Sequence, residues 1–219
     1  MSLNVRDIYK KRFTNELSSR NDVWSVICKE YLQPLIPEGS VLLDLGAGYC
    51  EFINNIRAKK KIAADLNTDM LKHAGPDVEC LIGSSTSLKR IKDSSVDVVF
   101  TSNFLEHLEK KDILSTLEEI QRILKVGGKL ILIQPNIRYC YKDYWMFFDH
   151  LTPLDHRSIA EVLMLNGFKI IKSIPKFLPY TTKSSYPKFP SLVRLYLSLP
   201  VLWFFFGKQM LVVAEKEAD

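Results

Sequence analysis

The stretch "LLDLGAGYCEF", residues 42–52, decides the fold of this chain. It is an apolar run that carries an acid, Asp44, and it continues into two glycines, Gly46 and Gly48, then an aromatic residue, a cysteine and a glutamate. Glycines at the junction between a strand and a helix let the backbone come close to a ligand. The pattern therefore predicts a ligand-binding loop at the end of a buried strand.

The segments around this loop alternate between strand and helix patterns. Apolar, strand-like runs occupy 40–46, 60–67, 78–83, 95–103, 129–136, 168–177 and 208–216, and helical patterns occupy 51–58, 68–75, 104–125 and 155–168. Strands that alternate with helices form a mainly parallel sheet through right-handed crossovers. In such an α/β sheet the ligand lies at the carboxyl ends of the strands, which is where the glycine loop belongs.

Composition narrows the class of protein. A chain of 219 residues with 47% hydrophobic content is long enough for one well-buried domain. The net charge of +5 mildly favours anionic partners, such as a phosphorylated substrate or an acidic membrane surface, and is too small to indicate nucleic acid. The four cysteines form no CxxC pair and the N-terminus has no apolar signal region, so we expect a reduced, cytoplasmic protein.

The glycine loop does not fit a dinucleotide. The dinucleotide fingerprint needs a third glycine at the position where this chain has Glu51. A carboxylate in the first helical turn would face the pyrophosphate of NAD or FAD at a site that has to attract anions. The sequence also lacks the Gly-Lys-Ser/Thr of a Walker loop.

A series of motifs resembles the class I S-adenosylmethionine-dependent methyltransferases, and in particular a prokaryotic group of them. "VLLDLGAGYCEF" resembles the first motif, and the later motifs follow in order as "IAADLNTDML", "LIGSSTSL", "SVDVVFTSNFLEHL", "LKVGGKLILIQPN" and "HRSIAEVLMLNGFKI". The resemblance spans the chain from about Val41 to the C-terminus. It implies a Rossmann-like, seven-stranded, mostly parallel sheet with an antiparallel last strand and helices on both faces. It also implies S-adenosyl-L-methionine as the cofactor.

The same resemblance implies the residues that bind this cofactor. Asp65 ends the second strand, where its two oxygens match the two ribose hydroxyls. The chain departs from the family at Cys50, which replaces the third glycine, and at Ser84, which replaces the acid that receives the adenine amino group. The expected cofactor-binding residues are Asp44, Gly46, Ala47, Gly48, Asp65, Leu66, Ser84, Ser85 and Asn103.

Two histidines are the candidate catalytic residues. His150 follows the aromatic stretch "YWMFFD", and we favour it over His156, which the N-cap Asp155 would place in a solvent-facing helical turn. His107 lies beside Glu106, where it either acts as a base or caps the top of the sheet. Tyr139, Tyr141, Tyr144, Trp145, Phe147 and Phe148 are candidates to line a substrate pocket. The histidine spacing matches no zinc pattern, so we expect no metal.

We expect a single methyltransferase domain over residues 1–219. Residues 1–40 form an N-terminal helical cap, 41–177 the cofactor-binding core, 178–208 an insertion between the last two strands, and 209–219 the final strand. If the sixth strand is parallel to the others, the insertion covers the active site. Its apolar part, residues 191–206, is interpreted as a packed lid, with a peripheral membrane contact or a homodimer surface as alternatives.

The expected function is S-adenosylmethionine-dependent methyl transfer to a small-molecule, sugar or lipid-linked acceptor. One alternative is a methyltransferase-like scaffold with weak or no activity, which the departures at Cys50 and Ser84 would explain. The other is a nucleotide-cofactor oxidoreductase on a related fold, against which Glu51 argues.

Overall fold

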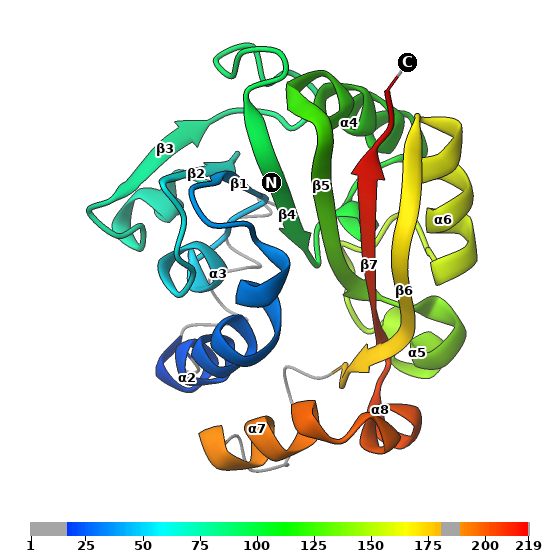
Figure 1. Ribbon diagram of the computed structural model, residues 1–219. Coiled ribbons are helices and arrows are strands. Elements are labelled where there is room, and N and C mark those ends of the chain that lie inside the picture. Colours follow the sequence, from blue (N-terminus) through cyan, green and yellow to red (C-terminus); the bar gives the residue numbers. More distant parts are fainter. Residues whose placement is uncertain (1–16, 181–188, 219) are drawn as a thin grey trace, which may run out of the picture.

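The protein is built around one seven-stranded sheet in the order β3-β2-β1-β4-β5-β7-β6 (Figure 1). The computed structural model describes residues 17–180 and 189–218. Neighbouring strands among β1 to β5 are parallel, whereas β7 is antiparallel to both β5 and β6. The expected Rossmann-like sheet is thereby confirmed. The strands are β1 (Val41–Leu45), β2 (Lys60–Asp65), β3 (Val78–Ile82), β4 (Val96–Ser102), β5 (Leu124–Pro135), β6 (Phe168–Leu178) and β7 (Gln209–Lys216).

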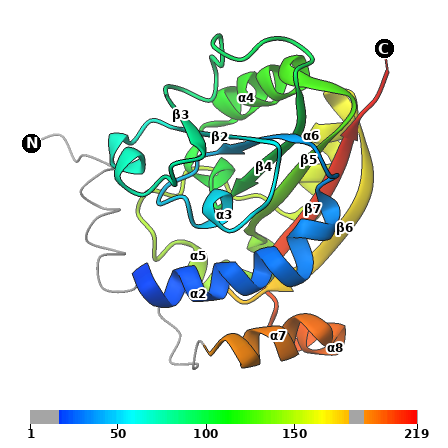
Figure 2. The ribbon, with the colours of Figure 1, turned by 60° about the vertical axis from the view of Figure 1, so that its left-hand side comes forward.

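Helices cover both faces of the sheet, because its strands are apolar on both sides (Figure 2). Leu43 of β1 joins a core with α4 (Lys110–Ile123) and α6 (His156–Leu165). Its neighbour Leu42 points to the other face and joins a core with α2 (Leu17–Ile27) and α3 (Glu51–Asn54). Alternate residues of one strand therefore belong to two separate hydrophobic cores, one on each face of the sheet.

Several helices are shorter than their sequence patterns predicted. The predicted helix over 104–125 is a 3-10 turn, η4 (Leu105–His107), followed by α4. The carbonyl of Glu106 accepts the N–H groups of Leu151 and Thr152 at 2.8 and 3.1 Å, so it takes its partners from another loop rather than from a continuous helix. The remaining short elements are the π-helix η1 (Cys28–Leu32), the 3-10 helices η2 (Gln33–Leu35) and η3 (Thr68–Lys72), and the unexpected α-helix α5 (Ile137–Tyr144).

The direction of β6 decides where the insertion lies. Because β7 is antiparallel to β5 and β6 is antiparallel to β7, β6 runs parallel to the first five strands, as expected. Leu178 pairs with Gln209, so the chain between them leaves and re-enters the sheet at the carboxyl ends of the parallel strands. The insertion contains α7 (Pro190–Ser198) and α8 (Pro200–Phe206), which lie beyond that end of the sheet (Figure 1). Residues 181–188 of the insertion, and 1–16 of the expected cap, lie outside the described residues.

The insertion is fixed to the domain on one side and exposed on the other. Tyr196 donates its hydroxyl to the carbonyl of Phe177 at 2.8 Å, and the ring of Trp203 packs 5.2 Å from that of Phe177. Phe204 and Phe205 are 66% and 69% exposed, so these side chains do not pack on the domain, and the membrane and homodimer alternatives remain for them. Within residues 17–180 and 189–218, no helix is long and apolar enough to cross a bilayer.

Candidate active site

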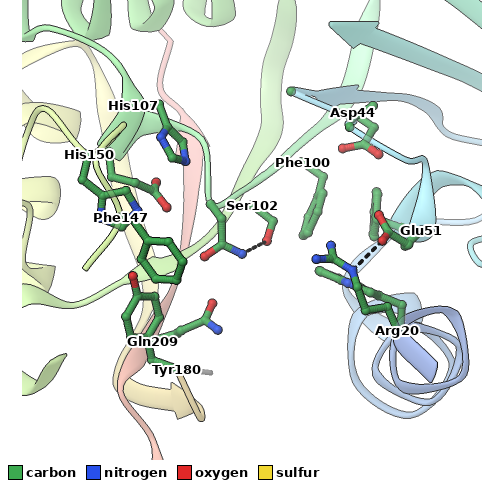
Figure 3. A pocket seen from close by; sticks show the side chains of 17 residues that line it. Arg20, Asp44, Glu51, Phe100, Ser102, His107, Phe147, His150, Tyr180 and Gln209 are labelled. Atoms are coloured by element: carbon green, nitrogen blue, oxygen red, sulfur yellow. Dashed lines mark hydrogen bonds and ion pairs between the residues drawn. The ribbon is translucent and has the colours of Figure 1, made fainter. Parts of the chain in front are cut away.

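An open pocket of about 840 Å³ lies where the carboxyl ends of β1 and β4 meet the N-terminal helix and the two ends of the insertion (Figure 3). The glycine loop lines one end of it, with Asp44 and Glu51. His107, His150 and Phe147 line the other end, and Asn103 also belongs to the pocket lining. The topology therefore brings together residues that are far apart in the sequence.

The glycine loop has the backbone geometry that its sequence predicts. Gly46 has a φ of +74°, and a Cβ added there would lie 2.5 Å from Cδ2 of Phe104. Gly48 has a φ of +53° and donates its N–H to Oδ2 of Asp65 at 2.8 Å. Cys50 adopts a φ of +62°, which explains why a glycine is usual at this position and shows that the cysteine keeps the turn. The loop therefore has no room for a side chain at Gly46, and its backbone at Gly48 is held by Asp65 at the end of the neighbouring strand β2.

The loop end of the pocket is rich in buried negative charge. Asp44 is 2% exposed, and among the described residues its Oδ2 has no hydrogen-bond partner. Burial, followed by the charges of Asp65 and Glu51, raises the pKa of Asp44 well above its usual range. Glu51 itself is paired with Arg20 at 2.8 Å. A buried carboxyl group with one unpaired oxygen gains a partner when the ammonium or sulfonium group of S-adenosylmethionine lies beside it, which favours its ionised form, whereas a pyrophosphate would be repelled.

Four of the expected cofactor-binding residues lie outside the set that lines the pocket. Asp65 accepts N–H groups from Gly48 and Asn67 at 2.8 and 2.7 Å, and it stands directly beside the loop. Leu66 is 70% exposed at the end of β2. Ser84 and Ser85 follow β3, where their hydroxyls pair with those of Thr86 and Thr116, each at 2.8 Å.

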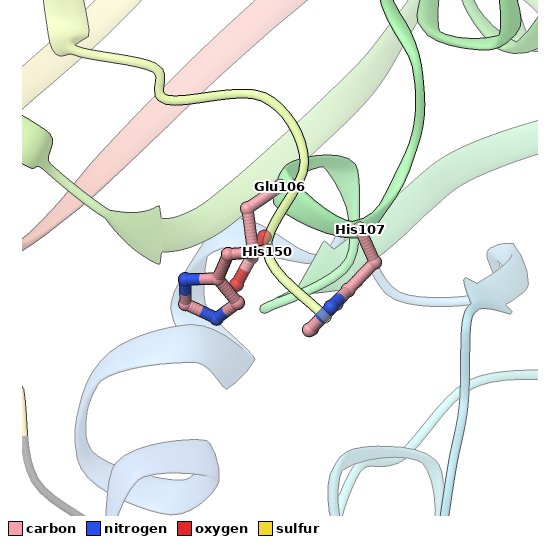
Figure 4. Close-up of side chains that lie close together, drawn as sticks. All are labelled: Glu106, His107 and His150. Atoms are coloured by element: carbon pink, nitrogen blue, oxygen red, sulfur yellow. The ribbon is translucent and has the colours of Figure 1, made fainter. Parts of the chain in front are cut away.

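The other end of the pocket holds Glu106, His107 and His150 (Figure 4). Glu106 is 1% exposed, and neither carboxylate oxygen has a hydrogen-bond partner among the described residues. Burial raises the pKa of Glu106 to about 7, although the neighbouring His107 opposes the shift. The Nδ1 atom of His107 lies 2.9 Å from the carbonyl oxygen of Asp149, and the rings of His107 and His150 are 5.0 Å apart.

The structure separates the aromatic candidates after β5. Phe147 lines the pocket and packs against His150. Tyr144 is buried outside the pocket lining, and its hydroxyl donates a hydrogen bond to the carbonyl of Thr152 at 2.7 Å. Tyr141, Trp145 and Phe148 are exposed. His150 belongs to the pocket lining, whereas His156 lies outside it and pairs with Asn136, and the preference for His150 as a catalytic residue stays a prediction.

Sequence reasoning missed several residues of the pocket wall. Trp24 and Arg20 come from α2, whose register against the sheet no local pattern reveals. Tyr180 and Gln209 flank the insertion, and their place at the carboxyl end of β6 and the start of β7 was a usable signal. Glu106 was noted only as a neighbour of His107, because its burial depends on the loop around Leu151.

Comparisons with known proteins agree with this geometry. Residues 43–132 match the family model of a methyltransferase domain. An uncharacterised methyltransferase-like protein of Schizosaccharomyces pombe is 35% identical over 105 residues, which are 45% of this chain and 40% of that protein. An uncharacterised protein of Methanocaldococcus jannaschii is 31% identical over 153 residues, 67% of this chain and 63% of the relative. This chain thus spans about 40% to 63% of the length of these two relatives.

Solved structures share the fold over nearly the whole chain. A S-adenosylmethionine-dependent methyltransferase of Archaeoglobus fulgidus superposes with a TM-score of 0.69 at 21% identity, over 93% of this chain and 99% of that one. A chain solved with the Trm112 methyltransferase activator of Haloferax volcanii superposes with a TM-score of 0.72 at 18% identity, over 99% of both chains. Residues 43–132 thus match a methyltransferase domain, and the sheet order and the glycine loop give this chain the fold of the class I S-adenosylmethionine-dependent methyltransferases, whose cofactor is S-adenosyl-L-methionine.

Proposed function

We propose that this protein transfers a methyl group from S-adenosylmethionine to a small acceptor held against His107 and His150. The observation that carries the proposal is the pair of unlike ends of one pocket: carboxylates beside the glycine loop, and a buried Glu–His–His group opposite them (Figure 3). The first end suits a cationic cofactor, and the second suits an acceptor that has to lose a proton. A hydroxyl on a small molecule, a sugar or a lipid-linked molecule fits this arrangement.

In this proposal each residue of the loop and its neighbours binds a different part of the cofactor. Asp44 takes the ammonium group of the methionine part, and the backbone at Gly46, Ala47 and Gly48 passes close beside it. Asp65 and Leu66 contact the ribose. Each carboxylate oxygen of Asp65 accepts one backbone hydrogen bond and keeps a second lone pair, which can accept a ribose hydroxyl. Asn103, with a φ of +47°, lies between the two ends and positions the reacting group.

The adenine end is the weakest part of the proposed cofactor site. Ser84 follows β3 and offers a hydroxyl where the family has an acid, so its hydrogen bond to the adenine amino group is weaker than that of a carboxylate. Ser85 is buried with its hydroxyl on Thr116, and we assign it a structural role. The departure at Cys50 has no comparable cost in this proposal, since the loop retains its turn.

When bound, S-adenosylmethionine supplies a methyl group on a positively charged sulfur. The acceptor attacks the methyl carbon in line with the carbon–sulfur bond, and the sulfur leaves. The protein contributes position and exclusion of water. His107 and His150 hold the acceptor at the end opposite the loop, and His107 is oriented by Asp149 at 2.9 Å. Phe147 and Tyr180 narrow the pocket wall on that side.

Calorimetry with S-adenosylhomocysteine and with NAD tests the cofactor, and formation of S-adenosylhomocysteine from a panel of hydroxyl acceptors tests the reaction. We expect binding of S-adenosylhomocysteine, no binding of NAD, and turnover with at least one acceptor. Binding of NAD in its place would favour the oxidoreductase alternative. Tight S-adenosylhomocysteine binding without turnover across sugar, lipid-linked and small-molecule acceptors would favour the scaffold alternative.

We further propose that the insertion, residues 178–208, is a cover whose exposed face rests on a membrane that presents the acceptor. Tyr180 and Gln209, at its two ends, line the pocket, while Phe204 and Phe205 point outward as an apolar face. Lys176 lies at this face, with its ammonium 4.5 Å from the Phe204 ring. Aromatic side chains beside a basic one are typical of a contact with an anionic membrane interface.

Co-sedimentation with phosphatidylglycerol and phosphatidylcholine vesicles tests this contact. We expect binding to the anionic vesicles, and loss of that binding in the double variant Phe204→Ser, Phe205→Ser. The matched control is Leu165→Ser on α6, which replaces an exposed apolar residue away from the insertion. A concentration-dependent dimer that the double variant abolishes, with no vesicle binding, would assign this face to a second copy of the chain instead.

A further inference from the structure

We propose that Glu106, His107 and His150 form a binding site for a divalent transition-metal cation at the acceptor end of the pocket. Each residue offers one ligand atom, and these atoms all lie within 4.8 Å of one another (Figure 4). The residues come from η4 and from the loop after α5. The histidines are far apart in the sequence, which is why their spacing gave no zinc pattern and the sequence favoured no metal.

The state of Glu106 is the first argument for a cation. Its side chain is buried and both carboxylate oxygens lack a hydrogen-bond partner among the described residues. Burial of an unpaired polar or charged group is costly unless a partner compensates it. The backbone carbonyl of Glu106 accepts hydrogen bonds from the N–H groups of Leu151 and Thr152. These bonds fix the backbone, so the carboxylate stays buried and does not turn to solvent. A bound cation supplies a partner for one of these oxygens and compensates the charge of the carboxylate.

The hydrogen bonding of His107 is the second, independent argument. Its Nδ1 lies 2.9 Å from the carbonyl oxygen of Asp149, which can only accept, so Nδ1 carries the hydrogen. The lone pair of the ring is then on Nε2. A histidine that donates one ring N–H to a carbonyl or carboxylate and leaves the other nitrogen as a ligand is the usual arrangement at metal sites. The Asp149 carboxylate, 3.4 Å away from Nδ1, strengthens this orientation.

The ligand set indicates which cations fit. Two imidazoles and one carboxylate suit zinc and other transition metals, whereas calcium and magnesium prefer oxygen ligands throughout. Bonds of about 2.0–2.2 Å in tetrahedral geometry bring ligand atoms to roughly 3.4 Å from one another. The separations of up to 4.8 Å therefore close by a small side-chain rotation on binding. All three residues line the pocket, so a fourth coordination position faces the acceptor.

This inference rests on the proposed methyl transfer and refines the part that the two histidines play in it. With an ion present, Nε2 of His107 binds the ion and not a proton. An acceptor hydroxyl at the open position becomes more acidic and loses its proton to solvent. Its oxygen then forms the new bond to the methyl carbon as the carbon–sulfur bond breaks, and the sulfur keeps that electron pair.

Titration of the untagged, chelator-treated full chain with Co²⁺ tests the site by a readout that is independent of activity. We expect one equivalent to bind with the intense visible absorption of a four-coordinate cobalt centre. Glu106→Gln and His150→Asn should each weaken binding at least tenfold. The chain has four histidines, so His73→Asn and His156→Asn are matched controls outside the pocket, and they should leave the titration unchanged.

The same samples separate the two proposals. If Glu106→Gln does not fold, His150→Asn reports the loss of a ligand on its own. Absence of the cobalt absorption from wild-type protein, or equal loss in a control histidine variant, would overturn the metal site. S-adenosylhomocysteine calorimetry is run in parallel. Cofactor binding without cobalt refutes only the metal inference, whereas cobalt binding without cofactor refutes the proposed methyl transfer.

Discussion

Replacement of Gly46 by alanine tests the glycine loop most directly, because the structure contains a matched control. Gly46 and Gly39 have almost the same backbone, with φ values of +74° and +76°. The left-handed conformation costs an alanine about 1–2 kcal/mol at either position. At Gly39 an added Cβ meets nothing within 4 Å, whereas at Gly46 it would lie 2.5 Å from the Phe104 ring. Only Gly46→Ala therefore pays a steric cost, of about 1–3 kcal/mol in addition.

Urea denaturation of the two variants measures the free energy of unfolding, and calorimetry with S-adenosylhomocysteine measures cofactor affinity. We expect Gly39→Ala to lose about 1–2 kcal/mol of stability and to bind the cofactor product normally. Gly46→Ala should lose about 2–5 kcal/mol and bind it more weakly, because the displaced ring or loop borders the pocket. Equal stability losses together with unchanged affinity would refute the reasoning, since Gly46 would then be no more than a turn residue.

Three further changes test other parts of the structure. Asp65→Ala should weaken S-adenosylhomocysteine binding by about 1.5–3 kcal/mol in calorimetry, and unchanged affinity would remove Asp65 from the site. Asp155→Ala removes the N-cap of α6 and should cost about 1 kcal/mol in urea denaturation at pH 7. Although burial opposes it, hydrogen bonds from the N–H groups of Ser158 and Arg157 lower the pKa of Asp155. The stabilisation is therefore present above its unfolded pKa of about 4 and is lost as the pH falls through the lower folded value. A cost that persists at pH 2 would contradict this. Trp203→Ala should destabilise the protein by about 2–3 kcal/mol and loosen the insertion, which limited proteolysis would detect; an unchanged cleavage pattern would argue against Trp203 as the anchor.

The sheet was predictable because its strands are buried on both faces. The runs over residues 40–46 and 95–103 are rich in apolar, partly β-branched residues, a pattern typical of strands buried on both faces. Helix boundaries were less predictable. The pattern over 104–125 is helical in periodicity, but the Glu106 carbonyl bonds to the distant residues Leu151 and Thr152, and no local rule contains that contact. The capping box at Asp155 and Ser158 was readable because it is local.

The candidate site divides in the same way. The loop from Asp44 to Gly48 lines the pocket as expected, since its position follows from the topology alone. The sequence could not show that the Ser85 hydroxyl turns to Thr116, because that choice depends on how α4 packs. Nor could it show that Glu106 is buried beside His150, which takes a tertiary contact between two loops.

The pairing of Leu178 with Gln209 has a consequence for how such proteins diversify. The sheet already holds the two ends of the insertion together, so the entropy of closing the loop changes by only about 0.6 kcal/mol for each doubling of its length. Segments of different length can be accommodated between these two residues at little entropic cost, provided that the contacts of Tyr196 and Trp203 with Phe177 are kept. The glycine loop lies between β1 and α3, away from that junction in sequence. The insertion can therefore vary in length in this fold while the glycine loop stays unchanged.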